Sequence, residues 1–308
     1  MNVIEVKNLV KDYGFGRGVF DISFSVKRGE VFGFLGPNGA GKSTTIRHLM
    51  GFSRPDAGSA RVLGRESFRE YHEILKDVGY IPGEIALPAG LTGREFLDMN
   101  MKMRGIESRD TLRRLLDIFE LDPAGETKRM SLGVKRKLAI VTAFMGDPDI
   151  LILDEPTSGL DPVMQEVFID FIKLQKEEGK TILLSSHMFN EIDATCDRIA
   201  IIKDGRIVSE FVANDLRHAK LKTYSVTLKG REAYLALAAG GGEGAPMRVI
   251  KADEDRLKLT FECEDGSINE VISRLAKAGI VRFKHRRETL EDYFMSYYAE
   301  DKDFGGTL

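Results

Sequence analysis

Short apolar runs along the first two thirds of the chain have the length and spacing of buried strands. Residues 31–35, 150–153 and 181–186 each form such a run, bounded by polar or turn-forming residues. Runs of this kind are typical of strands at the centre of an α/β sheet. Over residues 3–10 and 20–26 apolar and polar positions alternate instead, which predicts an antiparallel pair ahead of the first buried strand.

Helical spacing dominates the middle of the chain, where apolar residues recur every three or four positions over residues 93–121. The methionines at positions 99, 101 and 103 either fill a core or form an adaptable docking face. We expect a helical subdomain at about residues 84–132, inserted into an α/β core with a mixed sheet. An Asp-Gly pair at positions 204 and 205 predicts a hairpin farther along.

The pattern changes after about residue 216, and the remainder predicts a separate small α+β domain. Its elements follow the ferredoxin-like order β-α-β-β-α-β, with a final helix after them. No catalytic constellation occurs there, so a role in regulation or dimer contact and a plain structural role both stay open. The predicted domains are residues 1–217 and 218–308. The expected elements of the second domain are strands at 224–228, 247–251, 257–261 and 280–284, helices at 231–239, 267–278 and 290–298, and a glycine-rich loop at 240–244.

Composition and charge are those of a soluble globular protein. Of the 308 residues 43% are hydrophobic and 30% are charged, and the net charge is −3 without a long run of one sign. This balance argues against a general nucleic-acid binder. The apolar runs fall far short of the ~20 residues that a membrane span needs, and the N-terminus lacks the pattern of a signal peptide. Cys196 and Cys263 fall in different predicted domains, outside any metal-ligand pattern, which favours a reducing cytosolic compartment.

Residues 36–43 read Gly-Pro-Asn-Gly-Ala-Gly-Lys-Ser and match the phosphate-binding pattern GxxxxGK(S/T) between a predicted strand and a predicted helix. Glycines let successive backbone N–H groups face a phosphate, and the helix N-terminus adds its dipole. Lys42 would reach the β- and γ-phosphates, and Ser43 would place its hydroxyl on Mg²⁺. The residues expected to bind a nucleoside triphosphate here are Gly36, Pro37, Asn38, Gly39, Ala40, Gly41, Lys42, Ser43 and Thr44.

Two carboxylates stand where a phosphate site needs them. Asp154 and Glu155 directly follow the buried run 150–153. A carboxylate at the end of such a strand suits Mg²⁺, and a second one beside it can act as a general base toward an attacking water. We predict that Asp154 holds the metal together with Ser43 and that Glu155 is the base.

Two further residues are candidates by position. His187 follows the run 181–186, at the edge where open α/β sheets place ligands, although a lone histidine is usually a packed or surface residue. Tyr13 lies in a turn between the first two predicted strands. It either stacks on a nucleotide base or covers a strand edge, and the spacing favours neither.

Together these motifs resemble those of the ATP-binding cassette (ABC) ATPases over about residues 2–217. The sequence Met-Ser-Leu-Gly-Val-Lys at 130–135 resembles the family signature, usually Leu-Ser-Gly-Gly-Gln. Residues 158–161, Ser-Gly-Leu-Asp, are similar to the D-loop of the family, and His187 is similar to its switch histidine.

The resemblance implies a cofactor, a reaction and a dimer. ATP with Mg²⁺ would be hydrolysed, and two cassettes, expected to be identical, would close head to tail on two ATP molecules. Ser131 and Gly133 of one subunit would complete the ATP site of the other, and Asp161 is counted among the nucleotide-binding residues.

By the same resemblance Lys42, Glu155 and His187 are the catalytic residues. Glu155 would polarise the water, and His187 would contact the γ-phosphate and sense its presence. Loss of that phosphate would open the dimer, and a membrane protein docked on the helical subdomain would follow the motion.

Residues 223–308, with Arg-Glu-Thr-Leu-Glu-Asp-Tyr-Phe at 287–294, resemble the C-terminal extension on ATPase subunits of ABC-2-type exporters. An exporter subunit of this kind would lie in the cytoplasm, bound to the inner face of the membrane through a separate transmembrane permease. The transported substrate would be selected by that permease.

The sequence departs from the family pattern at two places. Leu132 stands where the signature usually has its first glycine, which would crowd the backbone near the phosphate. The glutamine expected after the strand at 78–81 is missing, because Pro82 is followed by Gly83 and Glu84. Glu84 is therefore an additional candidate ligand for Mg²⁺.

Two other functions stay open at this point. A soluble ABC ATPase could act on nucleic acid or the ribosome, although ribosomal members usually carry two cassettes in one chain. Members that act in repair have a long coiled coil between phosphate loop and signature, and the stretch between Lys42 and Ser131 shows no sustained heptads. The near-neutral charge also argues against a nucleic-acid partner. A nucleotide-dependent switch without transport is the third reading.

Overall fold

The computed structural model describes residues 1–217, 221–239, 246–286 and 289–299. The chain forms two compact units, Met1–Ala213 and Asn214–Leu308. The division falls just before the predicted boundary at residue 217, inside the short helix α8 (Ala213–Arg217). Within the described residues, no helix combines the length and the hydropathy that crossing a membrane requires.

A six-stranded mixed sheet forms the centre of the first unit, with the strand order β10-β9-β3-β8-β7-β6. The five strands from β9 to β6 run parallel, and β10 pairs antiparallel with β9 at the edge. Every residue of β3, β7 and β8 is buried, which explains their continuous apolar sequences. The strands are β3 (Val31–Leu35), β6 (Val78–Ile81), β7 (Ile150–Asp154), β8 (Thr181–Ser186), β9 (Arg198–Lys203) and β10 (Arg206–Val212).

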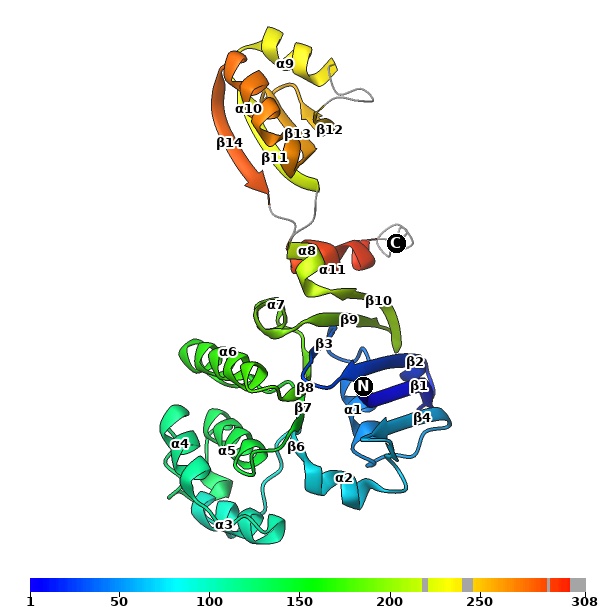
Figure 1. Ribbon diagram of the computed structural model, residues 1–308, viewed down its shortest axis with the longest axis vertical. Helices are drawn as coiled ribbons and strands as arrows, with labels where there is room; N and C mark the ends of the chain where they lie inside the picture. The colour runs from blue at the N-terminus through cyan, green and yellow to red at the C-terminus, as the bar shows by residue number, and fades with distance from the viewer. Residues whose placement is uncertain (218–220, 240–245, 287–288, 300–308) are drawn as a thin grey trace, which may run out of the picture. The chain divides into compact units, whose positions relative to one another are not determined.

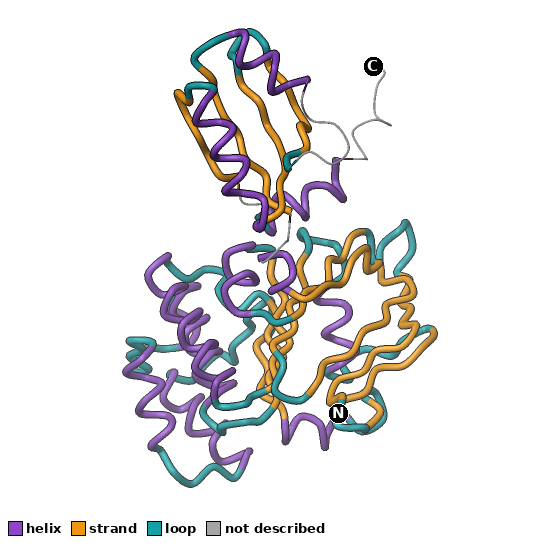
Figure 2. Tube along the Cα trace, turned by 45° about the horizontal axis from the view of Figure 1, so that its top comes forward, coloured by secondary structure: helices purple, strands orange, loops and turns teal. Residues whose placement is uncertain are grey.

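Two different layers cover this sheet (Figure 1). On one side lie α5 (Leu132–Phe144) and α6 (Pro162–Glu177), and α7 (Phe189–Thr195) follows β8. On the other side lie α1 (Lys42–Leu49) and a second, antiparallel sheet, as the tube view also shows (Figure 2). The predicted α/β core with a mixed sheet and an antiparallel part is confirmed.

The antiparallel sheet has the order β2-β1-β4-β5 and packs its apolar face toward β3. Phe24 of β2 stacks on Phe32 of β3 with ring centroids 5.2 Å apart, and it also contacts Phe34 at 5.4 Å. These aromatic contacts anchor the strand from which the phosphate loop emerges. The sheet consists of β1 (Asn2–Asp12), β2 (Gly18–Lys27), β4 (Ala57–Val62) and β5 (Arg65–Glu66), and α2 (Tyr71–Asp77) leads from it to β6.

The predicted helical subdomain contains α3 (Gly93–Arg104), α4 (Asp110–Ile118) and the short 3-10 helix η1 (Thr127–Arg129). A capping box between Thr92 and Glu95 starts α3 because each side chain accepts the other residue's backbone N–H. Of the three methionines that sequence alone leaves ambiguous, Met101 is buried in the core and Met103 is 78% exposed.

The strand order decides where the candidate residues meet. Strands β3, β8, β7 and β6 are parallel neighbours, so the loops after them gather at one edge of the sheet. Those loops begin at Gly36, His187, Glu155 and Pro82, respectively. This is the edge at which open α/β sheets bind ligands.

The second unit contains a four-stranded antiparallel sheet of order β12-β13-β11-β14. Tyr224 and Phe261 stack on one face of this sheet, in a core shared with Tyr234, Val271 and Leu275 of two helices. The predicted glycine-rich loop at 240–244 lies outside the described residues, as do residues 287 and 288 of the predicted motif. The elements are β11 (Leu221–Leu228), α9 (Arg231–Ala239), β12 (Arg248–Asp253), β13 (Lys258–Glu264), η2 (Asp265–Ser267), α10 (Ile268–Lys277), β14 (Ile280–Arg286) and α11 (Leu290–Ala299).

Candidate functional site

The loop between β3 and α1 has the geometry of an anion site. Gly41 has a φ of 110°, and a Cβ there would lie 2.8 Å from the Cγ1 atom of Val19, so only glycine fits. Helix α1 begins at Lys42, and no side chain of the described residues caps its N-terminus. The first N–H groups of a helix have no partner within the helix, so this N-terminus is suited to bind a phosphate.

Lys42 lies over the loop from which it projects. Its side chain is 5% exposed. The Nζ atom donates to the carbonyl oxygens of Gly36 at 2.6 Å and Pro37 at 3.1 Å. The same atom forms an ion pair with Oε1 of Glu155 at 3.0 Å. The ammonium group of Lys42 therefore lies at the loop, close to where a phosphate at the helix N-terminus would bind.

Glu155 joins two of the predicted catalytic residues. Its Oε2 atom lies 2.6 Å from Nδ1 of His187, while its Oε1 atom pairs with Lys42. The backbone of Glu155 has a φ of 50°, a left-handed conformation that is uncommon outside glycine. Its N–H donates to the carbonyl oxygen of Ser185 on β8 at 3.0 Å, which holds the turn in place. Such strained backbone clusters at functional sites.

Asp154 is 2% exposed and ends β7 beside the phosphate loop. Its Oδ1 atom accepts a 2.5 Å hydrogen bond from the hydroxyl of Ser185. The backbone of Gly83 comes close on the other side, because a Cβ on Gly83 would lie 2.8 Å from Oδ2 of Asp154 and 3.6 Å from Oγ of Ser43. One carboxylate, one hydroxyl and one loop backbone thus converge.

The convergence of Asp154 and Ser43 fits Mg²⁺, which keeps several waters and takes only one or two carboxylates beside substrate phosphates. No cluster of three or more His, Cys, Asp or Glu side chains suited to a metal occurs within the described ranges, so a cage built only of protein side chains does not arise there. The side chain of Glu84 is exposed.

The signature-like residues form a second group. The Ser131 hydroxyl accepts the Val134 N–H at 3.3 Å and caps α5, and Asp161 caps α6 by accepting the Met164 N–H at 3.0 Å. In the described part of the chain, no hydrogen bond or ion pair joins Ser131 or Asp161 to the phosphate loop.

The expected crowding at Leu132 takes a specific form. Its side chain is 57% exposed and lies against Gly159, where an added Cβ would meet the Leu132 Cγ atom at 2.7 Å. A Cβ on Gly133 would come within 3.1 Å of the Gly159 carbonyl oxygen. The start of α5 therefore packs tightly on the loop before α6 in the same subunit.

Tyr13 is 53% exposed in the turn after β1, and the ammonium group of Lys11 lies 5.8 Å from its ring centroid. Phe15 in the same turn is fully exposed with a φ of 55°. The geometry leaves an aromatic face at Tyr13 open to solvent.

Sequence patterns did not reveal three residues that the structure places around this site: Ser185, Arg136 and Glu191. Arg136 is buried in α5 and lies on the same helix face as Ile140 and Phe144. A charged residue at a position of an apolar helix face is a sequence signal that could have identified it. Ser185 and Glu191 carry no comparable pattern.

Glu191 is a buried carboxyl group on α7, the helix that follows His187. Its pKa is raised from 4.5 to about 7, mainly by burial and also by the Glu155 charge, while the hydroxyls of Ser186 and Thr157 and the charge of Arg136 act to lower it. Because the folded protein binds this proton more tightly than the unfolded chain, the group stabilises the fold fully only below about pH 4.5. That contribution is lost as the pH rises to 7.

Replacing Glu191 by glutamine is therefore expected to raise the free energy of unfolding above pH 7. The gain reaches up to about 3 kcal/mol, since one pKa unit is worth about 1.4 kcal/mol, and shrinks as the pH falls toward 5. Denaturant unfolding at pH 5 and pH 8 measures it. Glu166→Gln on the exposed face of α6 is the control. A difference between Glu191→Gln and wild type that is the same at both pH values would contradict the expectation.

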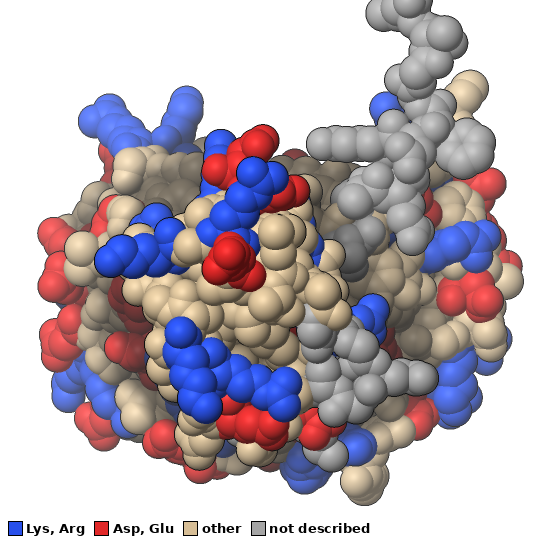
Figure 3. All heavy atoms as spheres, turned by 90° about the horizontal axis from the view of Figure 1, so that it is seen from above, with Lys and Arg blue, Asp and Glu red and all other residues tan. Residues whose placement is uncertain are grey.

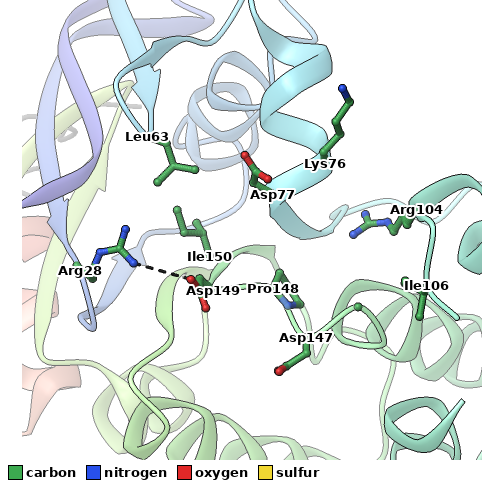
Figure 4. Close-up of a pocket in the computed structure, with 11 residues that line it drawn as sticks. Arg28, Leu63, Lys76, Asp77, Arg104, Ile106, Asp147, Pro148, Asp149 and Ile150 are labelled. Carbon is green, nitrogen blue, oxygen red and sulfur yellow. Dashed lines mark ion pairs between the residues drawn. The ribbon is translucent and has the colours of Figure 1, made fainter. Parts of the chain in front are cut away.

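A cavity of about 430 Å³ lies away from this site (Figure 4). It opens where β7 begins, at Pro148, Asp149 and Ile150, whereas Asp154 is at the other end of the strand. Arg28 and Asp149, which both line the cavity, form an ion pair at 3.9 Å.

On the face seen in Figure 3, Lys and Arg side chains are interspersed with Asp and Glu, without a large area of one sign.

Comparisons with known proteins agree with one another. The sequence profile of the ABC transporter family matches residues 19–158. The bacitracin transport ATP-binding protein BcrA of Bacillus licheniformis is 32% identical, over 99% of this chain and 99% of its own. The daunorubicin/doxorubicin resistance ATP-binding protein DrrA of Streptomyces peucetius is 38% identical, over 85% of this chain and 81% of its own. A dimeric structure of a bacterial ABC transporter cassette superposes with a TM-score of 0.62 at 26% identity, over 68% of this chain and 98% of that one.

Proposed function

This chain belongs to the ABC transporter family and is an ATP-hydrolysing subunit of the exporter type, and we propose that it drives a separate membrane permease through closure and opening of a cassette dimer. The observation that carries the proposal is that Glu155 contacts both Lys42 and His187. The three residues follow three parallel strands, β7, β3 and β8, and meet beside the phosphate loop.

In the proposed mechanism the loop amides and Lys42 bind the triphosphate, and Lys42 exchanges its contacts to loop carbonyls for the phosphate oxygens. Once Lys42 has left its ion pair with Glu155, a carboxylate oxygen of Glu155 accepts a proton from water as the water oxygen attacks the γ-phosphorus. The bond between the γ-phosphorus and the bridging oxygen breaks, and ADP leaves. His187 remains hydrogen-bonded to Glu155 and orients it toward the γ-phosphate. The geometry supports these roles because a single carboxylate lies within bonding distance of both partners.

We propose that Asp154 and Ser43 hold Mg²⁺ on the phosphate side. When bound, the ion neutralises charge that develops on the phosphoryl oxygens. The Ser185 hydroxyl fixes the orientation of Asp154 by donating to it, and burial of both residues keeps that orientation rigid. Glu84 stays a secondary candidate, and its exposure gives it less support than Asp154.

We propose that the second group of residues serves the partner subunit. Ser131 and Gly133, at an exposed helix N-terminus, would bind the γ-phosphate held by the other copy, and Asp161 would lie at the same interface. The separation of this group from the phosphate loop in one chain supports a head-to-tail dimer, as does the dimeric form of the bacterial cassette. Two identical chains satisfy this arrangement, and Tyr13 would stack on the adenine.

The relatives are named for different compounds, one for bacitracin transport and the other for daunorubicin/doxorubicin resistance. We therefore propose that a permease, and not this subunit, selects the substrate. The subunit would lie at the cytoplasmic face of the membrane and contact the permease through its helical subdomain, where Met103 is exposed. None of the site residues lies in the unit Asn214–Leu308, so we assign that unit an accessory role outside the chemistry.

The test of the membrane partner is affinity purification of the full chain from detergent-solubilised membranes, with mass spectrometry of the proteins that accompany it. A multi-span membrane protein in near-stoichiometric amount is expected. Recovery of ribosomal proteins without a membrane protein would contradict the transporter role and favour a soluble ATPase.

A further inference from the structure

A buried arginine connects three segments around the candidate metal position. Arg136 on α5 is 2% exposed. Its Nε atom donates to the carbonyl oxygen of Ser158 at 2.9 Å, Nη1 to that of Pro82 at 2.9 Å, and Nη2 to that of Gly83 at 2.8 Å. One planar guanidinium group thus bonds the loop after β6 and the loop after β7 to the helix that carries the signature-like residues.

The contacts of Arg136 are unusual because they involve backbone only. No carboxylate of the described residues forms an ion pair with this guanidinium, although Asp154, Glu155 and Glu191 act on it electrostatically. Burying a charge without a paired carboxylate is costly, and an apolar residue would fill the same volume at lower cost. A fork of fixed N–H directions, however, can hold several carbonyl groups in one relative position.

The position that Arg136 fixes is that of Gly83. The Gly83 backbone lies against Oδ2 of Asp154 and Oγ of Ser43, so a shift of this loop changes the space beside both groups. Helix α5 is packed into the core through Leu138, Ile140 and Phe144, and it gives the guanidinium a rigid base.

We propose that Arg136 is a positioning residue for the metal side of the reaction: it holds Gly83 beside Asp154 and Ser43, and in the same contact sets the loop at Ser158 that leads to Asp161. The proposal rests on the assignment of Asp154 and Ser43 to Mg²⁺. Removing the fork releases Gly83 toward or away from the metal position while the phosphate loop, which Arg136 does not touch, stays intact.

The experiment compares Arg136→Gln and Arg136→Lys with wild type in the full chain. The first readout is the affinity for Mn²⁺, measured by electron paramagnetic resonance in the presence of a non-hydrolysable ATP analogue. The second is binding of a fluorescent ATP analogue in excess EDTA, and the third is the Mg²⁺ concentration that half-saturates hydrolysis. Arg104→Gln is the matched control, because Arg104 is also desolvated and donates to a carbonyl of β6, that of Val78 at 3.5 Å, at the opposite end of the strand.

Arg136→Gln is expected to weaken Mn²⁺ binding about 10-fold or more, the range seen when a residue that orients metal ligands is lost. Metal-free binding of the fluorescent nucleotide should stay within twofold of wild type. Arg136→Lys keeps the charge but loses the planar fork, so an intermediate Mn²⁺ affinity is expected. The Arg104→Gln control should match wild type in all three readouts.

Gly83→Ala tests the same contact from the other side, since its added Cβ must displace the loop from Asp154 while leaving Arg136 in place. A double variant with Arg136→Gln should then lose little beyond the larger single effect, because both changes move one element. Mn²⁺ affinity within twofold of wild type in Arg136→Gln, or full additivity with Gly83→Ala, would overturn the proposal. Absence of Mg²⁺-dependent hydrolysis in wild type would instead reject the metal assignment on which it rests.

Discussion

Replacing Glu155 by glutamine is expected to lower ATP turnover at least ~100-fold while ATP still binds. The amide keeps the shape of the side chain but cannot accept a proton from water. Binding should survive because the phosphate loop and its glycine turn at Gly41 are untouched. Lys42 loses the ion pair that Glu155 provides at 3.0 Å and becomes more available to phosphate.

Steady-state hydrolysis and equilibrium binding of a fluorescent ATP analogue, measured on the same preparation, separate turnover from binding. Glu166→Gln, the same exchange on the exposed face of α6, is the control and should behave as wild type. Turnover of Glu155→Gln within a few-fold of wild type would reject Glu155 as the general base.

Replacing Lys42 by alanine is expected to weaken ATP binding itself, by at least ~30-fold. The loss of one member of a desolvated charged contact costs about 2–5 kcal/mol, and 2 kcal/mol corresponds to roughly 30-fold. Lys42 is almost fully buried against the loop. The same exchange removes the partner of Glu155, whose charge is left with His187 alone among its ion pairs in the described residues.

Equilibrium binding of the fluorescent analogue measures this effect, and thermal unfolding without nucleotide shows whether the variant is folded. Lys173→Ala on α6 is a suitable control, since its ammonium group pairs with the exposed Asp170. Unchanged ATP affinity in a folded Lys42→Ala protein would mean that the lysine does not reach the phosphates. The two variants thus dissect binding at Lys42 from chemistry at Glu155.

The contacts of Glu155 with Lys42 and His187 bring three residues of the proposed reaction together at one edge of the sheet. The proposed base Glu155 lies between Lys42 and His187, and Lys42 also bonds to carbonyls of its own loop. In the proposed mechanism, phosphate oxygens replace these contacts of Lys42 when ATP binds. This supports the proposal that gain and loss of the γ-phosphate move the loops that face a second subunit.

The phosphate loop could be predicted from sequence because everything it requires is local. A glycine at the left-handed position Gly41, a lysine and a hydroxyl occur within eight consecutive residues, between a buried strand and a helix. The buried runs of β3, β7 and β8 and the alternation of β1 and β2 are likewise local patterns, and they predicted the strands correctly. For the second unit, the four predicted strands and three predicted helices occur in the expected order.

Only the tertiary structure decided which of these segments are neighbours. The order β3-β8-β7-β6 follows from crossover connections and from packing against both layers, and it alone brings Glu155 between Lys42 and His187. The tertiary structure also decided that Met101 is buried while Met103 is exposed, and that Gly83 approaches Asp154. It decided as well the burial that raises the pKa of Glu191. Arg136 is the clearest case, since its three acceptors lie 22 to 54 positions away and are backbone atoms that any sequence supplies. A motif made of consecutive residues can be recognised from the sequence. Burial and hydrogen-bond partners instead depend on which surfaces the folded chain brings together.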